Sequence, residues 1–148
     1  MRELKTYKYM SLTEKSELVT GEIWASMAYS GDALMIQEYN KNIEYIVPEE
    51  GGNLWVDYFA VLSSSTRKEL AKAFINFINI PKNAARNAIF VHYATPNTAA
   101  KKLLPIEFLA DSTIYPDDNV LKNSEFFAEL PPKILKKRNT IFSNLINQ

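Results

Sequence analysis

The sequence contains no cysteine, which excludes disulfides, thiolate metal sites and a cysteine nucleophile. It contains a single histidine, His92, so one chain cannot build a metal site from several histidines. A Ser–His–acid triad would need His92, yet no Gly-x-Ser-x-Gly motif accompanies it. A loop or a helix end is the simpler place for this residue. We therefore predict no metal ion and no cofactor.

Paired acids are the remaining candidates for enzymatic chemistry. They occur at Glu49–Glu50 and at Asp117–Asp118. Adjacent acids usually lie in solvated turns, whereas an acid–base pair must converge on one substrate bond. Their spacing indicates no such convergence, so we predict that the chain is not an enzyme.

An excess of charge of either sign is also absent, because 17 lysines and arginines balance 17 aspartates and glutamates. The chain therefore lacks the basic field that nucleic-acid binding usually needs, and we predict no nucleic-acid partner. One local basic cluster occurs near the C-terminus. It is typical of the solvated face of a helix, and a nucleic-acid interface is the alternative. The cluster consists of Lys133, Lys136, Lys137 and Arg138.

Long apolar runs are missing as well. No stretch reaches the ~20 residues that a membrane-spanning helix needs. Residues 1–5 lack the apolar core of a signal peptide, so we expect no export signal in the chain as given. With 148 residues, 47% of them apolar, the chain has the length of one ordinary globular domain.

Strand-like and helix-like segments alternate along the chain, which favours an α/β fold. Short apolar runs predict strands over residues 22–29, 43–48 and 54–61. Capping patterns and helical periodicity predict helices over residues 12–20, 33–39, 70–78 behind a capping box at 66–69, 82–90, from Thr95 or Asn97 to 104, and from the pair Pro131–Pro132 to the C-terminus. The third of these helices carries an apolar stripe that we expect to be core, formed by Leu70, Phe74, Phe77 and Ile78.

Two adjacent glycines, Gly51 and Gly52, precede the third expected strand. They predict a sharp turn or a close approach to another part of the backbone. Beyond them, Trp55 and Asp57 would share one face of the strand. An aromatic ring beside a carboxylate suits a small organic cation, because the ring face attracts positive charge and the carboxylate neutralises it. The alternative is that Trp55 belongs to the core and Asp57 is a solvated acid.

Three blocks of sequence, at residues 21–33, 48–57 and 93–104, together point to a family. The first block begins with Gly-Glu and ends with Tyr-Ser-Gly-Asp-Ala. The second begins with Pro-Glu-Glu-Gly-Gly and ends with Leu-Trp-Val-Asp. The third begins with Tyr-Ala-Thr-Pro-Asn and ends with Lys-Lys-Leu-Leu. In these blocks, and in the tail at 114–125, the chain resembles the C-terminal part of bacterial spermidine/putrescine-binding proteins. Those proteins are the solute receptors of polyamine ABC transporters.

The resemblance implies the C-terminal part of a type II periplasmic-binding-protein fold, with a polyamine held in the cleft between two lobes. It also implies a transporter permease as partner and a periplasmic or cell-surface location. Carried over residue by residue, it assigns ligand contacts to Trp55, Asp57, Tyr93 and Tyr29, with Asp57 as a buried carboxylate. One departure is that Phe126 or Phe127 stands where many members have a polar residue, often glutamine.

Length is a second departure, since receptors of this family are more than twice as long as this chain. By resemblance, residues of about 1–57 and 102–148 belong to the second lobe, and about 58–101 form a segment of the first. The missing N-terminal lobe would then cover the stripe around Phe74, or a homodimer would do so. The alternative function is a self-associating accessory or truncated domain that binds no ligand of its own.

Overall fold

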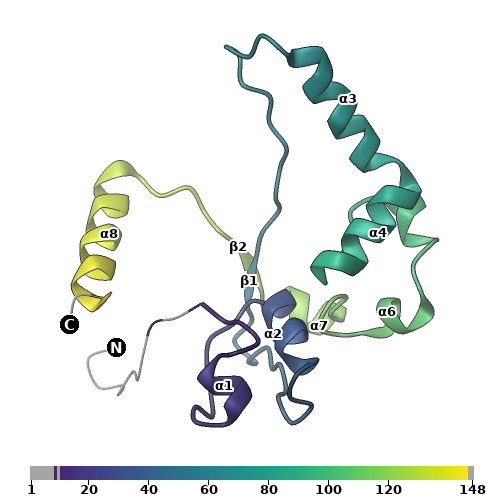
Figure 1. Ribbon diagram of the computed structural model, residues 1–148. Coiled ribbons are helices and arrows are strands. Elements are labelled where there is room, and N and C mark those ends of the chain that lie inside the picture. Colours follow the sequence, from purple (N-terminus) through teal and green to yellow (C-terminus); the bar gives the residue numbers. More distant parts are fainter. Residues whose placement is uncertain (1–8, 10, 147–148) are drawn as a thin grey trace.

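The computed structural model describes residue 9 and residues 11–146, and helices dominate this part of the chain. Figure 1 shows an open arrangement, in which the two short strands lie at the centre and helices extend away on either side. The helices are α1 (Glu17–Thr20), α2 (Ser30–Gln37), α3 (Lys68–Asn79), α4 (Pro81–Val91), α5 (Thr98–Lys101), α6 (Ile106–Ala110), α7 (Asp118–Lys122) and α8 (Pro132–Ile146). Among the described residues, no helix combines the length and the apolar character needed to cross a membrane.

The strands β1 (Asn53–Leu54) and β2 (Glu125–Phe126) pair in parallel, with Asn53 opposite Glu125. The pairing continues into the glycine pair, because the Glu125 N–H donates to the Gly52 carbonyl at 3.0 Å. Gly51 has a φ of +96°, and any side chain there would overlap the Asn123 carbonyl. This confirms the prediction that the two glycines bring the backbone close to another segment.

The three strands predicted from apolar runs were largely wrong. Residues 22–29 and 43–48 contain no strand, and only the start of 54–61 is one. The apolar residues of the first run are not buried either, since Trp24 is 93% and Met27 94% exposed. A strand needs a neighbour to pair its backbone N–H and C=O groups, and the described residues supply none beside these segments.

Helix ends were predicted with mixed success. The first helix starts at Glu17 and not at Leu12, and the hydroxyl of buried Ser16 instead accepts from the Thr13 N–H at 2.7 Å. Thr66 does not cap α3, whose N-cap is Arg67 without a side-chain bond. By contrast, the cap of α5 is confirmed, because Asn97 Oδ1 accepts from the N–H groups of Ala99 and Ala100.

The main buried cluster is small and lies where α4 meets α5, and Ala33 and Ile36 of α2 and Ile114 are buried apart from it. Alanines on one face of α4 pack with two residues that follow them, namely Ala84, Ala85, Ala88, Ala100 and Leu104. Alanine side chains let the two helices approach closely, but they bury little apolar area. The core therefore fixes the end of α4, from which the chain continues into Tyr93.

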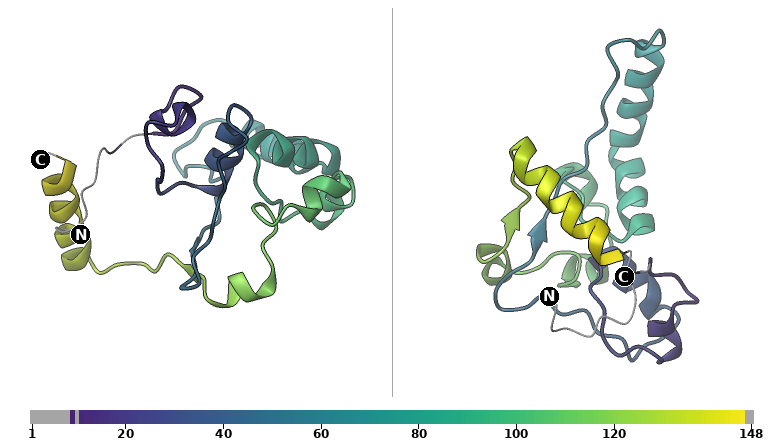
Figure 2. Two further views of the ribbon diagram at one scale, coloured as in Figure 1. Left: turned by 90° about the horizontal axis from the view of Figure 1, so that it is seen from below. Right: turned by 90° about the vertical axis from the view of Figure 1, so that its left-hand side faces the viewer.

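The apolar stripe of α3 is not core, which corrects the prediction for Leu70, Phe74, Phe77 and Ile78. Leu70 is 63% exposed, and no residue of α3 is buried. The helix projects from the rest of the molecule, and the chain between β1 and α3 runs up beside it (Figures 1 and 2). One ring contact joins them, between Phe59 and Phe74 at 6.3 Å. The stripe stays exposed because no layer of the described chain lies over it.

Candidate functional site

Three of the four predicted ligand residues meet in space. The Trp55 ring centroid lies 5.1 Å from that of Tyr29 and 5.7 Å from that of Tyr93, both edge to face. We call these three residues the aromatic cluster. The sequence resemblance grouped them, and the structure brings their rings into direct contact.

Each ring of the cluster is placed by the end of a secondary-structure element. Tyr29 is the N-cap of α2, and Trp55 directly follows β1. Tyr93 follows His92, which ends α4 in the left-handed conformation with a φ of 57°. The Tyr93 N–H then donates back to the Ala88 carbonyl, which ties the turn to the buried face of α4. His92 thus lies at a helix end, as the sequence predicted.

The ring distances limit how a ligand could use the cluster. An alkyl chain sandwiched between two parallel rings needs a spacing of about 7–8 Å, twice a carbon–carbon contact distance. The observed spacings are shorter, so the rings contact one another and leave no slot. A ligand would therefore lie on the outer surfaces of the cluster, where Trp55 is 38% exposed.

The two aspartates nearest the cluster differ in their surroundings. Asp57 is exposed, which corrects the expectation of a buried carboxylate at this position, and it does not line a cavity. Asp32 lies in the first turn of α2, is half-buried, and lines a cavity together with Tyr29 and Trp55. Sequence reasoning passed over Asp32 as part of a helix start. The signal that could have found it is its position directly after a glycine in the block Tyr-Ser-Gly-Asp.

The cavity beside the cluster measures about 1380 Å³. It is larger than the usual small-molecule pocket of roughly 300–1,000 Å³. Its further walls are the extended segments around Trp24 and Tyr45, and Phe127 also contributes. Phe127 is one of the two phenylalanines at which the chain departs from the polar pattern of the polyamine receptors.

Charge and burial both raise the pKa of Tyr93. Burial raises the pKa of its phenol above the ordinary value of 10.0, and the negative charge of Asp32 raises it further. The backbone N–H of Gly31 opposes these effects on the pKa. Burial also raises the pKa of Tyr45.

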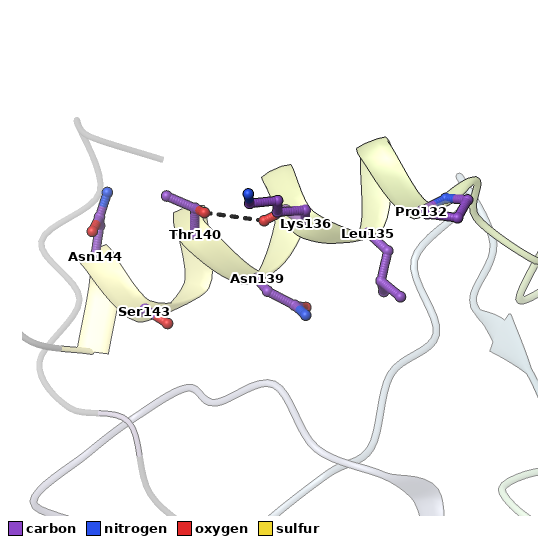
Figure 3. Close-up of a pocket in the computed structure, with 7 residues that line it drawn as sticks. All are labelled: Pro132, Leu135, Lys136, Asn139, Thr140, Ser143 and Asn144. Atoms are coloured by element: carbon purple, nitrogen blue, oxygen red, sulfur yellow. Dashed lines mark hydrogen bonds between the residues drawn. The ribbon is translucent and has the colours of Figure 1, made fainter.

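Other groups in the described residues do not form a competing site. No group of three or more His, Asp or Glu side chains there could hold a metal ion. His92 lies 3.7 Å from Glu38, which is a simple ion pair when the imidazole is protonated. A hollow of about 490 Å³ on α8 is lined by residues of that helix alone, from Pro132 to Asn144 (Figure 3). The hydrogen bond among these residues, from the Thr140 hydroxyl to the Lys136 carbonyl, is internal to the helix.

Comparison with solved structures identifies the fold. The structure matches a spermidine/putrescine ABC transporter protein from Listeria monocytogenes with a TM-score of 0.72 and 39% identity, covering 78% of this chain and 36% of that one. It matches the substrate-binding protein of a spermidine/putrescine transporter from Streptococcus pneumoniae with a TM-score of 0.66, at the same identity and coverage. The predicted fold class, an incomplete periplasmic-binding-protein fold, is confirmed.

Sequence relatives agree with the structural ones. The spermidine/putrescine-binding periplasmic protein of Escherichia coli is 38% identical over 106 residues, which are 72% of this chain and 30% of that protein. A norspermidine sensor of Vibrio cholerae is 34% identical over 145 residues, which are 97% of this chain and 40% of the sensor. The chain thus spans well under half the length of these relatives. They are solute-binding proteins and not enzymes, as predicted for this chain.

The sequence profile of one family matches residues 3–116, and this stretch contains Tyr29, Trp55, Asp57 and Tyr93. The resemblance drawn from the three sequence blocks is therefore confirmed at the level of the family. The chain belongs to the family of bacterial extracellular solute-binding proteins.

Proposed function

We propose that this chain forms one wall of a polyamine-binding site in the solute-binding component of an ABC transporter. The observation that carries the proposal is the aromatic cluster, with Trp55 in contact with both tyrosines and Asp32 lining one cavity with Tyr29 and Trp55. The names of the relatives support the ligand class, since they include spermidine, putrescine and norspermidine.

The chemistry of the cluster suits a polyamine, which carries ammonium groups separated by methylene spacers. Each ammonium over an aromatic face gains roughly 0.5–2 kcal/mol, depending on how far it is desolvated. The methylenes gain about 25 cal/mol for each Å² of apolar area that the rings cover. Tyr29, Trp55 and Tyr93 supply the rings, and Asp32 and Asp57 supply negative charge.

The two carboxylates are expected to contribute unequally. A hydrogen bond to a charged group in a partly buried place contributes about 1.5–3 kcal/mol, whereas an exposed ion pair contributes about 0.2–1 kcal/mol. Asp32 is half-buried and Asp57 is exposed. We therefore assign the stronger ammonium contact to Asp32 and the weaker one to Asp57.

The test is calorimetric titration of the chain with putrescine and with spermidine. Asp32→Asn should weaken binding by about 10- to 100-fold and Asp57→Asn by a few fold, by the energies above. Asp118→Asn is the matched control, because this exposed acid lies in α7 and outside the cavity. Equal heats for all four proteins would exclude the assigned site.

We further propose that the rest of a receptor covers the exposed apolar surfaces of this chain. The relatives extend far beyond the matched stretch, and α3 and the segment before it present Phe59, Phe74 and Phe77 to solvent. The proposed division assigns residues of about 1–57 and 102–148 to the second lobe and about 58–101 to the first. Figure 1 supports it, because the chain leaves the region of β1 by an extended segment before it enters α3.

A chimera tests this completion. The matched stretch of the Listeria monocytogenes protein would be replaced by this chain, and polyamine affinity would be measured for chimera and isolated chain. Higher affinity in the chimera supports the proposal, and equal affinity would contradict it. A transporter permease as partner and a periplasmic or cell-surface location rest on the same relatives, whose names place them in ABC transporters and in the periplasm.

One observation favours a second candidate function, self-association without ligand binding. Exposed apolar faces promote association, and the stripe on α3 is such a face. Light scattering would then give a dimer mass that returns to the monomer mass in Leu70→Lys. A monomeric chain with measurable polyamine affinity would exclude this alternative.

A further inference from the structure

Gly31 lies directly against the ring of Tyr93. A Cβ atom built on Gly31 would stand 2.6 Å from two ring carbons of Tyr93 and 2.9 Å from its hydroxyl oxygen. Carbon atoms in contact are normally about 3.5–4.0 Å apart. Alanine at this position would therefore force the Tyr93 ring to move.

The reason for glycine here is space and not backbone conformation. Gly31 sits inside the first turn of α2 and has no positive φ, whereas Gly21 and Gly51 do. Gly52 would meet its neighbours at 3.5 Å or more, and Gly51 would meet the backbone of another segment. Of the four glycines, Gly31 is thus the one whose missing side chain makes room for a ring of the aromatic cluster.

Tyr93 also contacts Trp55, at 5.7 Å between centroids. The Gly31 backbone N–H faces the phenol, and an N–H in the first turn of a helix has no partner within the helix. The ring is thus confined by the start of α2 and by the indole. Its position decides how much of Trp55 stays open to a ligand.

We propose that Gly31 is a positioning residue that holds the Tyr93 ring against Trp55 and so sets the shape of the aromatic cluster. The link to ligand affinity rests on the proposed polyamine function. The placement of the ring does not, and it can be measured without any ligand.

The first experiment is a nuclear magnetic resonance comparison of Gly31→Ala with the unchanged chain. The chain has two tryptophans, and exposed Trp24 serves as the internal reference for Trp55. Gly31→Ala should shift the Trp55 indole N–H signal and leave that of Trp24 in place. Asp118→Asn, in α7 and outside the cavity, is the control and should shift neither. An unchanged Trp55 signal in Gly31→Ala would overturn the proposal.

A double-variant cycle separates positioning from a general structural effect. In a Tyr93→Ala background the added Cβ has no ring to displace, so Gly31→Ala should cause no further shift of Trp55. The same shift in both backgrounds would contradict the proposal. If Gly31→Ala alone fails to fold, folding of Gly31→Ala with Tyr93→Ala supports the proposal, and failure of both overturns it.

The binding readout follows on the same variants. Spermidine affinity should fall about 2- to 30-fold in Gly31→Ala, the equivalent of one aromatic contact, and should stay unchanged in Asp118→Asn, which lies outside the cavity. If the unchanged chain binds no polyamine, the proposed function fails while the Trp55 signal still decides the role of Gly31. If the chain binds and Gly31→Ala binds equally well, the link between the cluster's shape and ligand affinity is overturned.

Discussion

The Trp55 indole contacts the Tyr29 phenol edge to face, with ring centroids 5.1 Å apart and planes inclined at 66°. The two rings come from different elements, since Trp55 follows β1 and Tyr29 caps α2. Edge-to-face pairs contribute about 0.5–1.5 kcal/mol beyond the area that they bury. The contact therefore ties the end of the strand to the start of the helix, at the centre of the proposed site.

Replacing Trp55 by alanine should weaken polyamine binding and lower stability together. It removes the ring shared by both contacts of the cluster, so we expect a loss of about 1–3 kcal/mol in the free energy of unfolding. Phe90→Ala is the matched control, because that aromatic side chain is 84% exposed and lies outside both the cluster and the cavity. Urea denaturation and spermidine titration measure the two effects. Similar losses in both variants would contradict the central place of Trp55.

Gly51→Ala should be more harmful than Gly21→Ala. Both glycines have a positive φ, but only a side chain at Gly51 would overlap the Asn123 carbonyl. The strained backbone costs about 1 kcal/mol at either position, and the overlap adds to this at Gly51. Urea denaturation of the two variants gives the difference directly. Equal losses would mean that β1 and β2 do not approach as described.

Asn97→Ala should lower the free energy of unfolding by about 1 kcal/mol. It removes the side-chain cap of α5, whose Oδ1 accepts from two backbone N–H groups, and helix caps contribute about 0.5–2 kcal/mol. Asn97 Nδ2 also donates to the Asn79 carbonyl, which joins α5 to the end of α3. Asn87→Ala on exposed α4 surface is the control. A stability equal to that of the control would exclude the cap.

Stability should fall as pH rises above about 10, and Tyr93 should account for part of the fall. Its folded-state pKa is raised above 10.0 by burial and by Asp32, so folding favours the neutral phenol. This contribution is complete below about pH 10 and is lost as pH rises through the raised pKa. Tyr93→Phe should show a shallower fall, and Tyr58→Phe, at an 85% exposed position, should follow the unchanged chain. Urea denaturation across this pH range measures the effect, and identical pH profiles for the two variants would contradict it.

Local signals in the sequence were sufficient for features that depend on neighbouring residues. The glycine pair at 51–52 predicted a sharp turn or a close approach of backbones, and the sequence offered Thr95 or Asn97 as a helix cap, of which Asn97 caps α5. Each of these follows from one residue's own conformation or side-chain bond. They needed no knowledge of the rest of the fold.

Features that depend on a partner could not be read from the chain alone. The apolar run around Trp24 predicted a buried strand, and the stripe around Phe74 predicted core, yet both are exposed. An apolar pattern indicates that a surface is to be covered, but it does not supply the cover. The site shows the same division, because family resemblance grouped Tyr29, Trp55 and Tyr93 while Asp32 became apparent only through the cavity that it lines with Tyr29 and Trp55.

The most direct test of the account is a spermidine titration of the chain with both tryptophan indoles observed by nuclear magnetic resonance. The account predicts a saturable shift of the Trp55 N–H signal, because the ligand lies on the exposed surface of the aromatic cluster. Trp24 lies in another wall of the same cavity and outside the cluster, so its signal should shift less than that of Trp55. No saturable shift of Trp55, or equal shifts of the two signals, would contradict the claim that this cluster binds a polyamine.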